Sequence, residues 1–387
     1  MMEAIDWLLL AAIPGLGPTL LNRLAQKFGP GEAIIKASES QLTAVTGITP
    51  SLATAIRQAR QDEAIARLQR EIDRLTALGG QIVLRHQACY PSLLSRITNP
   101  PPLLFALGST EVLQQQAILA IVGTRAASVD GCQVAYRLAF DLARQGWVPV
   151  SGLAIGIDSA VHQGALDGGG RTIAVMASGL NLDYPKPNRA LKERIRQQGG
   201  CLITEACLDT PALATLFPLR NRIISGMSLG VVVVEAPLRS GALITARLAL
   251  DQGRSVFAVP GPVQDPRSRG VHQLLRDGAR LVEGVEDIVA ELGWPNGPMV
   301  MTNPGSAPTL ALPPHAPSSP SHPGLPDDMP DEALPVYQRL QQGSCHQDEL
   351  LRHCQLTGAT LSRILLYLEL SGTIERLPGN LFALAAT

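Results

Sequence analysis

The stretch Phe217-Pro218-Leu219-Arg220-Asn221-Arg222-Ile223-Ile224-Ser225-Gly226 sets two arginines and an amide between apolar residues, ahead of the strand-like run Val231–Val234. Arg220 and Arg222 keep their charge in a folded protein, so burying both without partners would be prohibitive. Each guanidinium therefore needs an anion. An internal carboxylate or a bound phosphate could supply it, and the loops around this stretch bear on the choice.

Short apolar runs alternate with helical patterns on both sides of this stretch. The predicted strands are Ala117–Val122, Val148–Val150, Thr172–Met176, Cys201–Thr204, Val231–Glu235 and Val256–Val259. The predicted helices between them include Gln133–Arg144, Asn188–Arg196, Ala242–Asp251 and Val271–Arg276. This alternation predicts an α/β fold, a parallel sheet covered on both faces, whose ligands lie beyond the carboxyl ends of the strands.

Nearly every predicted strand ends in a loop that combines Gly, Ser or Thr with Arg or Lys. Glycine lets the backbone approach an anion, hydroxyl groups donate hydrogen bonds, and arginine neutralises charge. Because the fold gathers these ends along one rim, we expect one positive, hydroxyl-lined crevice. The candidate binding residues are Gly123, Thr124, Arg125, Ser128, Ser151, Gly152, Lys186, Asn188, Phe217, Arg220, Asn221, Arg222, Ser240, Gly241 and Thr245.

The sequence lacks the motifs of the common nucleotide-binding enzymes. No GxGxxG follows the first strand and no GxxxxGK[ST] occurs, so neither a dinucleotide fingerprint nor a P-loop is present. Asp158 and His162 lie four residues apart on one predicted helix face. Such a pair is more often a cap and a packed imidazole than an acid/base pair, and no activated nucleophile stands beside it. We therefore predict no catalytic residues and a phosphate-rich ligand that is held rather than converted.

The motifs along this region resemble those of the DprA/Smf family, the DNA-processing proteins of bacterial natural transformation. The resemblance runs from about Ile118 to Val282. It rests on Val122–Arg125 with Ser128, Ser151–Asp158 with His162, Tyr184-Pro185 with Asn188, Phe217–Ile224, Ser240-Gly241 with Ile244–Ala246, and Val259–Gly261. Thr124 stands where the family usually has Ser, which keeps the hydroxyl, and His272 stands where it commonly has Asn.

The resemblance implies an extended Rossmann-like domain that binds single-stranded DNA, forms a homodimer and delivers the strand to the recombinase RecA. Contact with single-strand-binding protein belongs to the same expectation. Gly123, Thr124 and Arg125 would hold phosphate at the first strand end. Lys186 and the pair Arg220 and Arg222 would add charge to the same groove. Phe217 would offer its ring to a base or pack in the core, since base–aromatic stacking is worth about 1–3 kcal/mol.

We predict four segments in the chain. Residues 1–78 read as a helical, SAM-like domain in which the turns at Gly15-Leu16-Gly17 and Gly47-Ile48-Thr49 resemble helix-hairpin-helix motifs. Such turns expose backbone N–H groups that can bind a phosphate, or they serve as caps in a docking module. Thr49 stands where the second hairpin would have Gly. Residues 79–293 form the Rossmann-like domain, which begins with a connecting segment from about Gln81 to Asn99.

The carboxyl-terminal part changes character twice. Residues 294–331 are rich in Pro, Ser and Gly, which predicts a disordered or extended linker. Residues 332–387 read as three helices, Val336–Leu340, Glu349–His353 and Thr360–Leu370, followed by a hairpin over Gly372–Phe382. This order resembles a winged helix. The third helix holds Arg363 against Glu369, which favours a role in protein contact over DNA reading.

Composition excludes a globally basic protein. The net charge is −1 and apolar residues make up 45% of the sequence, so any nucleic-acid site is a local patch with salt-dependent binding. The six cysteines form no CxxC motif and read as reduced, packed thiols of a cytoplasmic protein that has no metal site and no cofactor. No apolar run is long enough to span a membrane.

Two other functions stay open. An enzyme on the same architecture would resemble the lysine-decarboxylase-like phosphoribohydrolases, whose PGGxGTxxE loop supplies a catalytic Glu. The comparable stretch here is Pro237–Thr245, with no Glu after it. A pure scaffold would fill the crevice with internal carboxylates, and pairing of both Arg220 and Arg222 with Asp or Glu would support it.

Overall fold

The computed structural model describes residues 2–293, 333–341, 345–354, 360–361, 364–365, 368, 373–377 and 381–384. The chain divides into two compact units, Met1–Thr302 and Asn303–Thr387, and each unit is taken by itself below. The predicted linker 294–331 lies outside the described residues.

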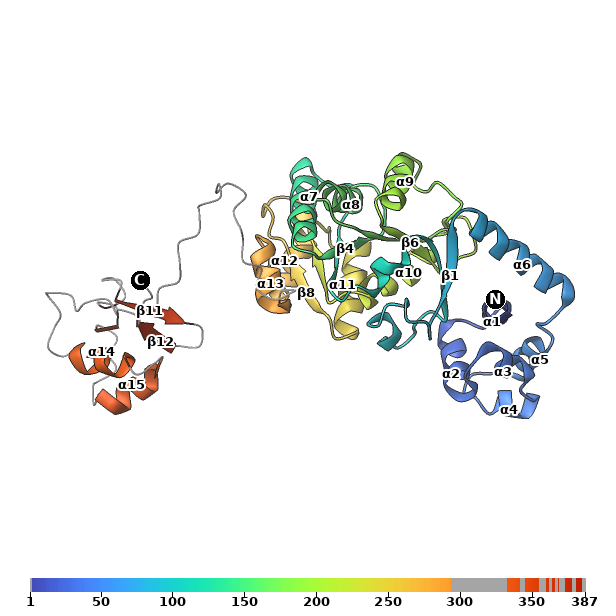
Figure 1. The fold of residues 1–387 in the computed structure, drawn as a ribbon, viewed down its shortest axis with the longest axis horizontal. Helices are drawn as coiled ribbons and strands as arrows, with labels where there is room; N and C mark the ends of the chain where they lie inside the picture. Colours follow the sequence, from blue (N-terminus) through green and yellow to red (C-terminus); the bar gives the residue numbers. More distant parts are fainter. Residues whose placement is uncertain are drawn as a thin grey trace, which may run out of the picture. The chain divides into compact units, whose positions relative to one another are not determined.

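A nine-stranded sheet forms the centre of the first unit over residues 2–293 (Figure 1), with the strand order β1-β2-β6-β5-β4-β3-β7-β8-β9. Strands β3 to β9 run parallel, with Ala120 of β3 beside Val150 of β4 on one side and Val231 of β7 on the other. The parallel strands are β3 (Ile118–Val122), β4 (Val148–Ser151), β5 (Ile173–Val175), β6 (Cys201–Thr204), β7 (Gly230–Val233), β8 (Ser255–Ala258) and β9 (Arg280–Leu281). Each strand predicted from the sequence is present, with its ends shifted by at most two residues.

The prediction of a connecting segment from about Gln81 to Asn99 is wrong at its beginning. Residues Gly80–Leu84 form strand β1, which pairs antiparallel with β2 (Leu103–Gly108). Strand β2 in turn pairs antiparallel with β6. Both strands are short apolar runs whose pairing depends on distant residues, so local pattern alone did not reveal them.

Alternate residues of the central strands face different helices. Leu119 and Ile121 of β3 pack with helices α7, α8 and α13, whereas Ala120 and Val122 pack with α10, α11 and α12. Figure 1 shows α7 and α8 on one side of the sheet and α11 on the other. The helices are α7 (Val129–Arg144), α8 (Ile157–Asp167), α9 (Arg189–Gln197), α10 (Leu216–Gly226), α11 (Gly241–Asp251), α12 (Arg269–Arg276) and α13 (Val285–Leu292). Short 3-10 turns are η1 (Leu94–Arg96), η2 (Thr110–Gln114), η3 (Lys186–Asn188) and η4 (Pro266–Ser268).

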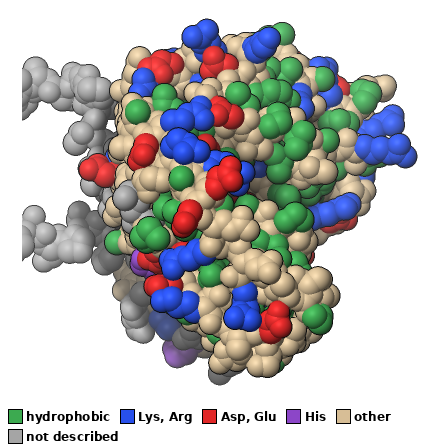
Figure 2. Space-filling view, turned by 90° about the vertical axis from the view of Figure 1, so that its right-hand side faces the viewer, with side chains coloured by type: hydrophobic (Ala, Val, Ile, Leu, Met, Phe, Trp, Pro, Cys, Tyr) green, Lys and Arg blue, Asp and Glu red, His purple; other side chains and the backbone are tan. Residues whose placement is uncertain are grey.

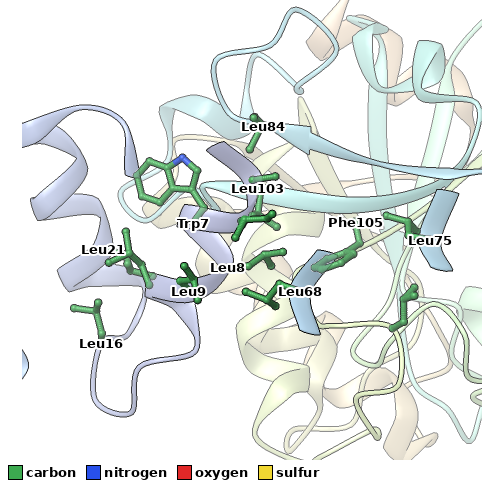
Figure 3. Close-up of a cluster of buried hydrophobic side chains, with 14 of the residues drawn as sticks. Trp7, Leu8, Leu9, Leu16, Leu21, Leu68, Leu75, Leu84, Leu103 and Phe105 are labelled. Atoms are coloured by element: carbon green, nitrogen blue, oxygen red, sulfur yellow. The ribbon is translucent and has the colours of Figure 1, made fainter. Parts of the chain in front are cut away.

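The amino-terminal helices share a hydrophobic core with the edge of the sheet. Figure 3 shows Leu8 and Leu68 beside Phe105 of β2, and the same cluster includes Leu75 and Leu103. The helices are α1 (Met2–Ala11), α2 (Pro18–Phe28), α3 (Gly31–Lys36), α4 (Glu39–Thr43), α5 (Pro50–Arg57) and α6 (Asp62–Ala77). The helical prediction for this segment is therefore confirmed.

The two predicted hairpin turns differ in their local chemistry. Gly17 precedes α2 with no side-chain cap, so its turn presents bare backbone N–H groups. Thr49 caps α5 instead, because its hydroxyl oxygen accepts a hydrogen bond from the Leu52 N–H at 3.3 Å. Arg23 ties the turns together by donating to the Thr46 carbonyl at 2.8 Å.

The second unit contains α14 (Leu334–Leu340), α15 (Gln347–Cys354), β10 (Cys345–His346), β11 (Ile374–Leu377) and β12 (Leu381–Leu384). The strands lie in the order β10-β12-β11, and the described residues between 360 and 368 are helical. Val336, Leu350, Leu365 and Phe382 contribute to one buried cluster. This is the helix-and-hairpin order expected of a winged helix, although Arg363 and Glu369 lie outside the described residues.

Candidate nucleic-acid interface

The strand order reverses between β3 and β7, since the chain builds the sheet outward in one direction through β6 and then returns to the other side of β3. In an open α/β sheet the ligand crevice lies at such a switch point, beyond the carboxyl ends of the strands. A groove of about 490 Å³ lies there. It is lined by the loop after β3, the loop after β7 and the first turns of α10 and α11, through residues that include Gly123, Thr124, Arg125, Phe217, Arg220, Asn221, Arg239, Ser240, Gly241 and Thr245.

Glu235 fixes the loop that follows β3. Its backbone carbonyl accepts the Thr124 N–H at 2.7 Å, and its carboxylate accepts the Ser128 N–H at 2.9 Å and the Ser128 hydroxyl at 2.5 Å. A Cβ atom on Gly131 would overlap the Glu235 carboxyl group, so a larger residue here would push this carboxylate out of its present position. Glu235 was not among the predicted site residues, although an acidic residue at the carboxyl end of a predicted strand was the signal that could have revealed it.

Arg125 stands on that loop with its side chain exposed. Its guanidinium carbon lies 4.6 Å from the centroid of the Phe217 ring, within the range of a cation–π contact. The Tyr184 ring lies 6.1 Å from Phe217, at an interplanar angle of 59°. A small hollow of about 80 Å³ opens beside these three side chains. One cation, Arg125, and two aromatic rings, Phe217 and Tyr184, therefore lie together beside the groove.

Arg220 lies in the floor of the groove and is only 7% exposed. Its Nη1 donates to the Gly152 carbonyl at 2.8 Å and also to the Val175 carbonyl. Its Nε finds no acceptor among the residues that the structure describes. Burial lowers the pKa of Arg220 to about 10 while the Asp158 carboxylate acts in the opposite direction, so the guanidinium stays charged at neutral pH. A Cβ atom on Gly152 would overlap this guanidinium, which explains the glycine.

Arg222 forms an ion pair with an internal carboxylate, whereas Arg220 has Asp158 near it without a direct ion pair among the described residues. Its Nη2 lies 2.6 Å from both carboxylate oxygens of Glu205, while its Nη1 has no partner within the described part of the chain. Burial raises the pKa of Glu205, and Arg222 opposes that rise. Only one of the two arginines is thus paired as the scaffold interpretation requires, because Arg220 donates its hydrogen bonds to carbonyl groups.

The first turn of α11 forms the opposite wall of the groove. The Ser240 hydroxyl accepts the Ala242 N–H at 3.2 Å, and the space above the Gly241 Cα is open. Asn221 donates to the Gly241 carbonyl at 3.3 Å, as does the buried Thr245 hydroxyl. Exposed Arg239 lines the groove beside this turn and was missed in the sequence reading. A helix N-terminus next to arginine favours an anionic ligand.

The remaining predicted residues support the loops around the groove. Ser151 is fully buried and donates to the Ile121 carbonyl at 2.7 Å. Asn188 is also buried, and its amide donates to the Leu153 and Ala154 carbonyls at 2.9 and 3.2 Å. The Ser128 hydroxyl donates to Glu235 and accepts the Gly131 N–H at 2.8 Å. Lys186 is exposed on η3, outside the groove lining.

Asp158 lines the groove although it is only 7% exposed, and His162 is fully buried one turn further along α8. Asp158 accepts hydrogen bonds from the Gly152 and Ala154 N–H groups at 3.1 and 3.3 Å. His162 is fully buried, and its Nδ1 lies 2.8 Å from the Thr172 hydroxyl, whose own proton goes to the Pro149 carbonyl. Nδ1 must therefore donate, which leaves Nε2 as an acceptor without a partner among the described residues. This geometry agrees with a packed imidazole.

Burial, with a smaller contribution from Arg220, lowers the pKa of His162 from 6.5 to about 3. The imidazole is protonated below about pH 6.5 in the unfolded chain but stays neutral in the folded protein down to about pH 3. The free energy of unfolding therefore falls as the pH drops from 6.5 toward 3. We expect the free energy of unfolding to fall about 2 kcal/mol more between pH 7 and pH 5 in the wild type than in His162→Gln, as measured by urea titration. The raised pKa values of Asp158 and Glu205 act in the opposite direction but are common to both proteins.

The matched control is Gln163→Ala, which changes an exposed residue without a titratable group on the same helix and should keep the wild-type dependence. Equal pH dependence in the wild type and His162→Gln would contradict a neutral buried ring.

Charged side chains of both signs are interspersed on the face seen in Figure 2, as the small net charge predicts. Among the described residues, no cluster of three or more His, Cys, Asp or Glu side chains could hold a metal ion. None of the described helices combines the length and the apolar character needed to cross a bilayer.

Comparisons with known proteins cover all three folded parts of the chain. The family DNA recombination-mediator protein A matches residues 81–293, the DprA winged helix domain matches residues 313–380, and a SAM-like helix-hairpin-helix tandem matches residues 8–62. Protein Smf of Escherichia coli is 40% identical over 296 residues, which are 75% of this chain and 74% of that protein.

Two solved structures are also similar. The X-ray structure of DprA from Streptococcus pneumoniae has a TM-score of 0.63 and 34% sequence identity, and the match covers 72% of this chain and 94% of that one. DprA from Helicobacter pylori, described for its single-stranded DNA binding mode, has a TM-score of 0.50 and 29% identity over 55% of this chain and 95% of that one.

Proposed function

The chain belongs to the DNA recombination-mediator protein A family, and we propose that it binds single-stranded DNA during DNA uptake and natural transformation. The observation that carries this proposal is the groove at the switch point, where Arg125, Arg220 and the first turn of α11 meet. A chain of phosphates with unstacked bases matches a groove that offers fixed positive charge and the half-buried ring of Phe217. The single-stranded DNA binding described for the Helicobacter pylori relative supports the same ligand.

In this proposal the rim residues act in three ways. Arg125, Arg220, Arg239 and Lys186 attract the backbone, and the N–H groups near Gly123, Thr124, Ser240 and Gly241 donate to phosphate oxygens. Phe217 stacks on a base. Ser128, Ser151, Gly152, Asn188, Asn221, Arg222 and Thr245 hold the loops and α10 in position.

The finer parts of the proposal rest on family membership. The protein would protect the incoming strand, act as a homodimer, pass the strand to the recombinase RecA and meet single-strand-binding protein, without chemistry of its own. Pull-down of RecA with and without bound strand tests the transfer, and light scattering tests the dimer.

Replacing Arg125 by alanine should weaken binding and also change its salt dependence. One lost phosphate contact lowers the slope of log affinity against log salt by about 0.7 for a single strand. Fluorescence anisotropy with a labelled oligonucleotide at several salt concentrations measures both quantities. The control is Arg137→Ala, which removes an exposed arginine that pairs with Asp141 on α7. A slope unchanged in Arg125→Ala would show that this side chain contacts no phosphate.

A further inference from the structure

Hollows follow the carboxyl edge of the sheet in strand order. The groove lies over the ends of β7 and β3, and the small hollow beside Phe217 lies over the ends of β4 and β5. A third hollow of about 230 Å³ continues over the ends of β5 and β6 and the start of β2. Helix α10 borders all three, since Phe217 lines the first two and Arg220 lines the first and the third. Met176 and Ala177 line both the second and the third, so the three hollows adjoin one another along the rim.

The third hollow is closed on its far side by the amino-terminal helices. Its lining includes Leu8 of α1, Leu16 of the first hairpin turn and Leu21 of α2, together with Leu216 and Ile223 of α10. Figure 3 shows Leu8, Leu16, Leu21 and Leu103 within the shared hydrophobic cluster. None of the residues that line this hollow is aromatic. Its walls are thus aliphatic, unlike those of the small hollow, where Phe217 and Tyr184 supply rings.

The third hollow has a polar end toward the sheet. Thr204, Glu205 and Arg220 line it there, and the Arg220 Nε is a buried donor that has no acceptor among the described residues. Leu219 borders the hollow with 45% of its surface exposed, so the hollow is accessible from solvent. A flat heterocycle with polar edges fits an aliphatic slot that ends in hydrogen-bonding groups.

We propose that this third hollow seats one unstacked base of the bound strand, next to the nucleotide held at Arg125 and Phe217. The inference rests on the proposed function and extends it, because it makes the first hairpin a wall of the strand-binding site. Its position selects this occupant, since the hollow shares Arg220 with the charged groove and Met176 and Ala177 with the small hollow beside Phe217. The amino-terminal domain then contributes to strand binding through its apolar side chains.

A scan with 2-aminopurine tests the seat in the full chain. The fluorescence of this base is quenched by stacking, so a base in an aliphatic hollow should brighten, whereas one on Phe217 should stay dim. We expect a strand of thymidylates to show one bright position next to a dim one when 2-aminopurine is moved along it. Filling the hollow with Ala206→Leu should remove the bright position and weaken binding about tenfold.

A second filling variant, Ala11→Leu, guards against misfolding, because Ala11 is exposed at the end of α1 and lines the hollow, and leucine fills space without a ring that could quench the base. The control is Ala190→Leu, an exposed change on α9 that should leave the bright position intact. Tight binding without any bright position, or a bright position that survives both filling variants, would overturn the inference. Absence of strand binding by the wild type would instead refute the proposed function itself.

Discussion

Arg220→Met is expected to lose strand binding by at least about 100-fold and to lower the free energy of unfolding by about 3 kcal/mol. The binding loss follows because the variant removes the buried charge in the floor of the groove. The stability loss follows because two carbonyl groups, those of Gly152 and Val175, lose their donor and Asp158 loses its neighbouring cation. Urea unfolding and anisotropy titrations on the same preparation measure both effects.

A double variant separates the two losses. Asp158→Asn removes the uncompensated carboxylate and keeps an amide oxygen that can accept the Gly152 and Ala154 N–H groups. Arg220→Met with Asp158→Asn should therefore recover about half of the lost stability but none of the lost affinity. If the double variant recovered its affinity for single strands, the charge of Arg220 would affect binding only by stabilising the folded protein.

Glu235→Ala is the second change with a large expected effect. It would release the anchor of the loop that carries Arg125, since the Glu235 carboxylate holds the Ser128 N–H and hydroxyl. Ordering a backbone residue costs about 1–2 kcal/mol, so a loop freed over even two residues should weaken strand binding about 100-fold. The loss should appear as weaker affinity with little change in the salt slope, because Arg125 keeps its charge.

Conservative variants test the same anchor. Glu235→Gln keeps one oxygen for the Ser128 N–H and should retain most of the affinity, and Glu283→Ala changes an exposed glutamate as the matched control. If Glu235→Ala bound single strands like the wild type, the anchor would be irrelevant to the position of Arg125.

The sequence predicted the parallel strands because each is a short apolar run bounded by Gly or polar residues, as at Cys201–Thr204. It left the central stretch without an assignment, and Leu216–Gly226 is a helix that buries Arg220, Asn221 and Arg222. Two arginines on a helix between apolar residues suit a surface or a core equally. Arg220 is enclosed because it meets the loop after β4 and the last residue of β5. Tertiary contacts of that kind carry no local pattern.

The candidate site was predictable to a similar degree. Loop composition indicated Arg125 and the turn at Ser240-Gly241, which do meet in one groove. It could not separate side chains that face the groove from those that hold its walls, such as Ser151 and Asn188, because Ser and Asn suit both roles. Glu235 and Arg239 were missed for the same reason, since their importance depends on neighbours more than 100 residues away or across a turn.

The core that the first helices share with β2 has a consequence for how the molecule comes apart. Phe105 is fully buried in the same cluster as Leu68 and Leu75 of α6, so this helix cannot leave without uncovering the flank of the sheet. Removing α1 to α6 would expose a large apolar surface at the edge of the sheet. We expect the truncated protein to aggregate for that reason. Helices α1 to α6 and the sheet therefore unfold in one cooperative transition. Proteolysis between them should be slow until that transition occurs.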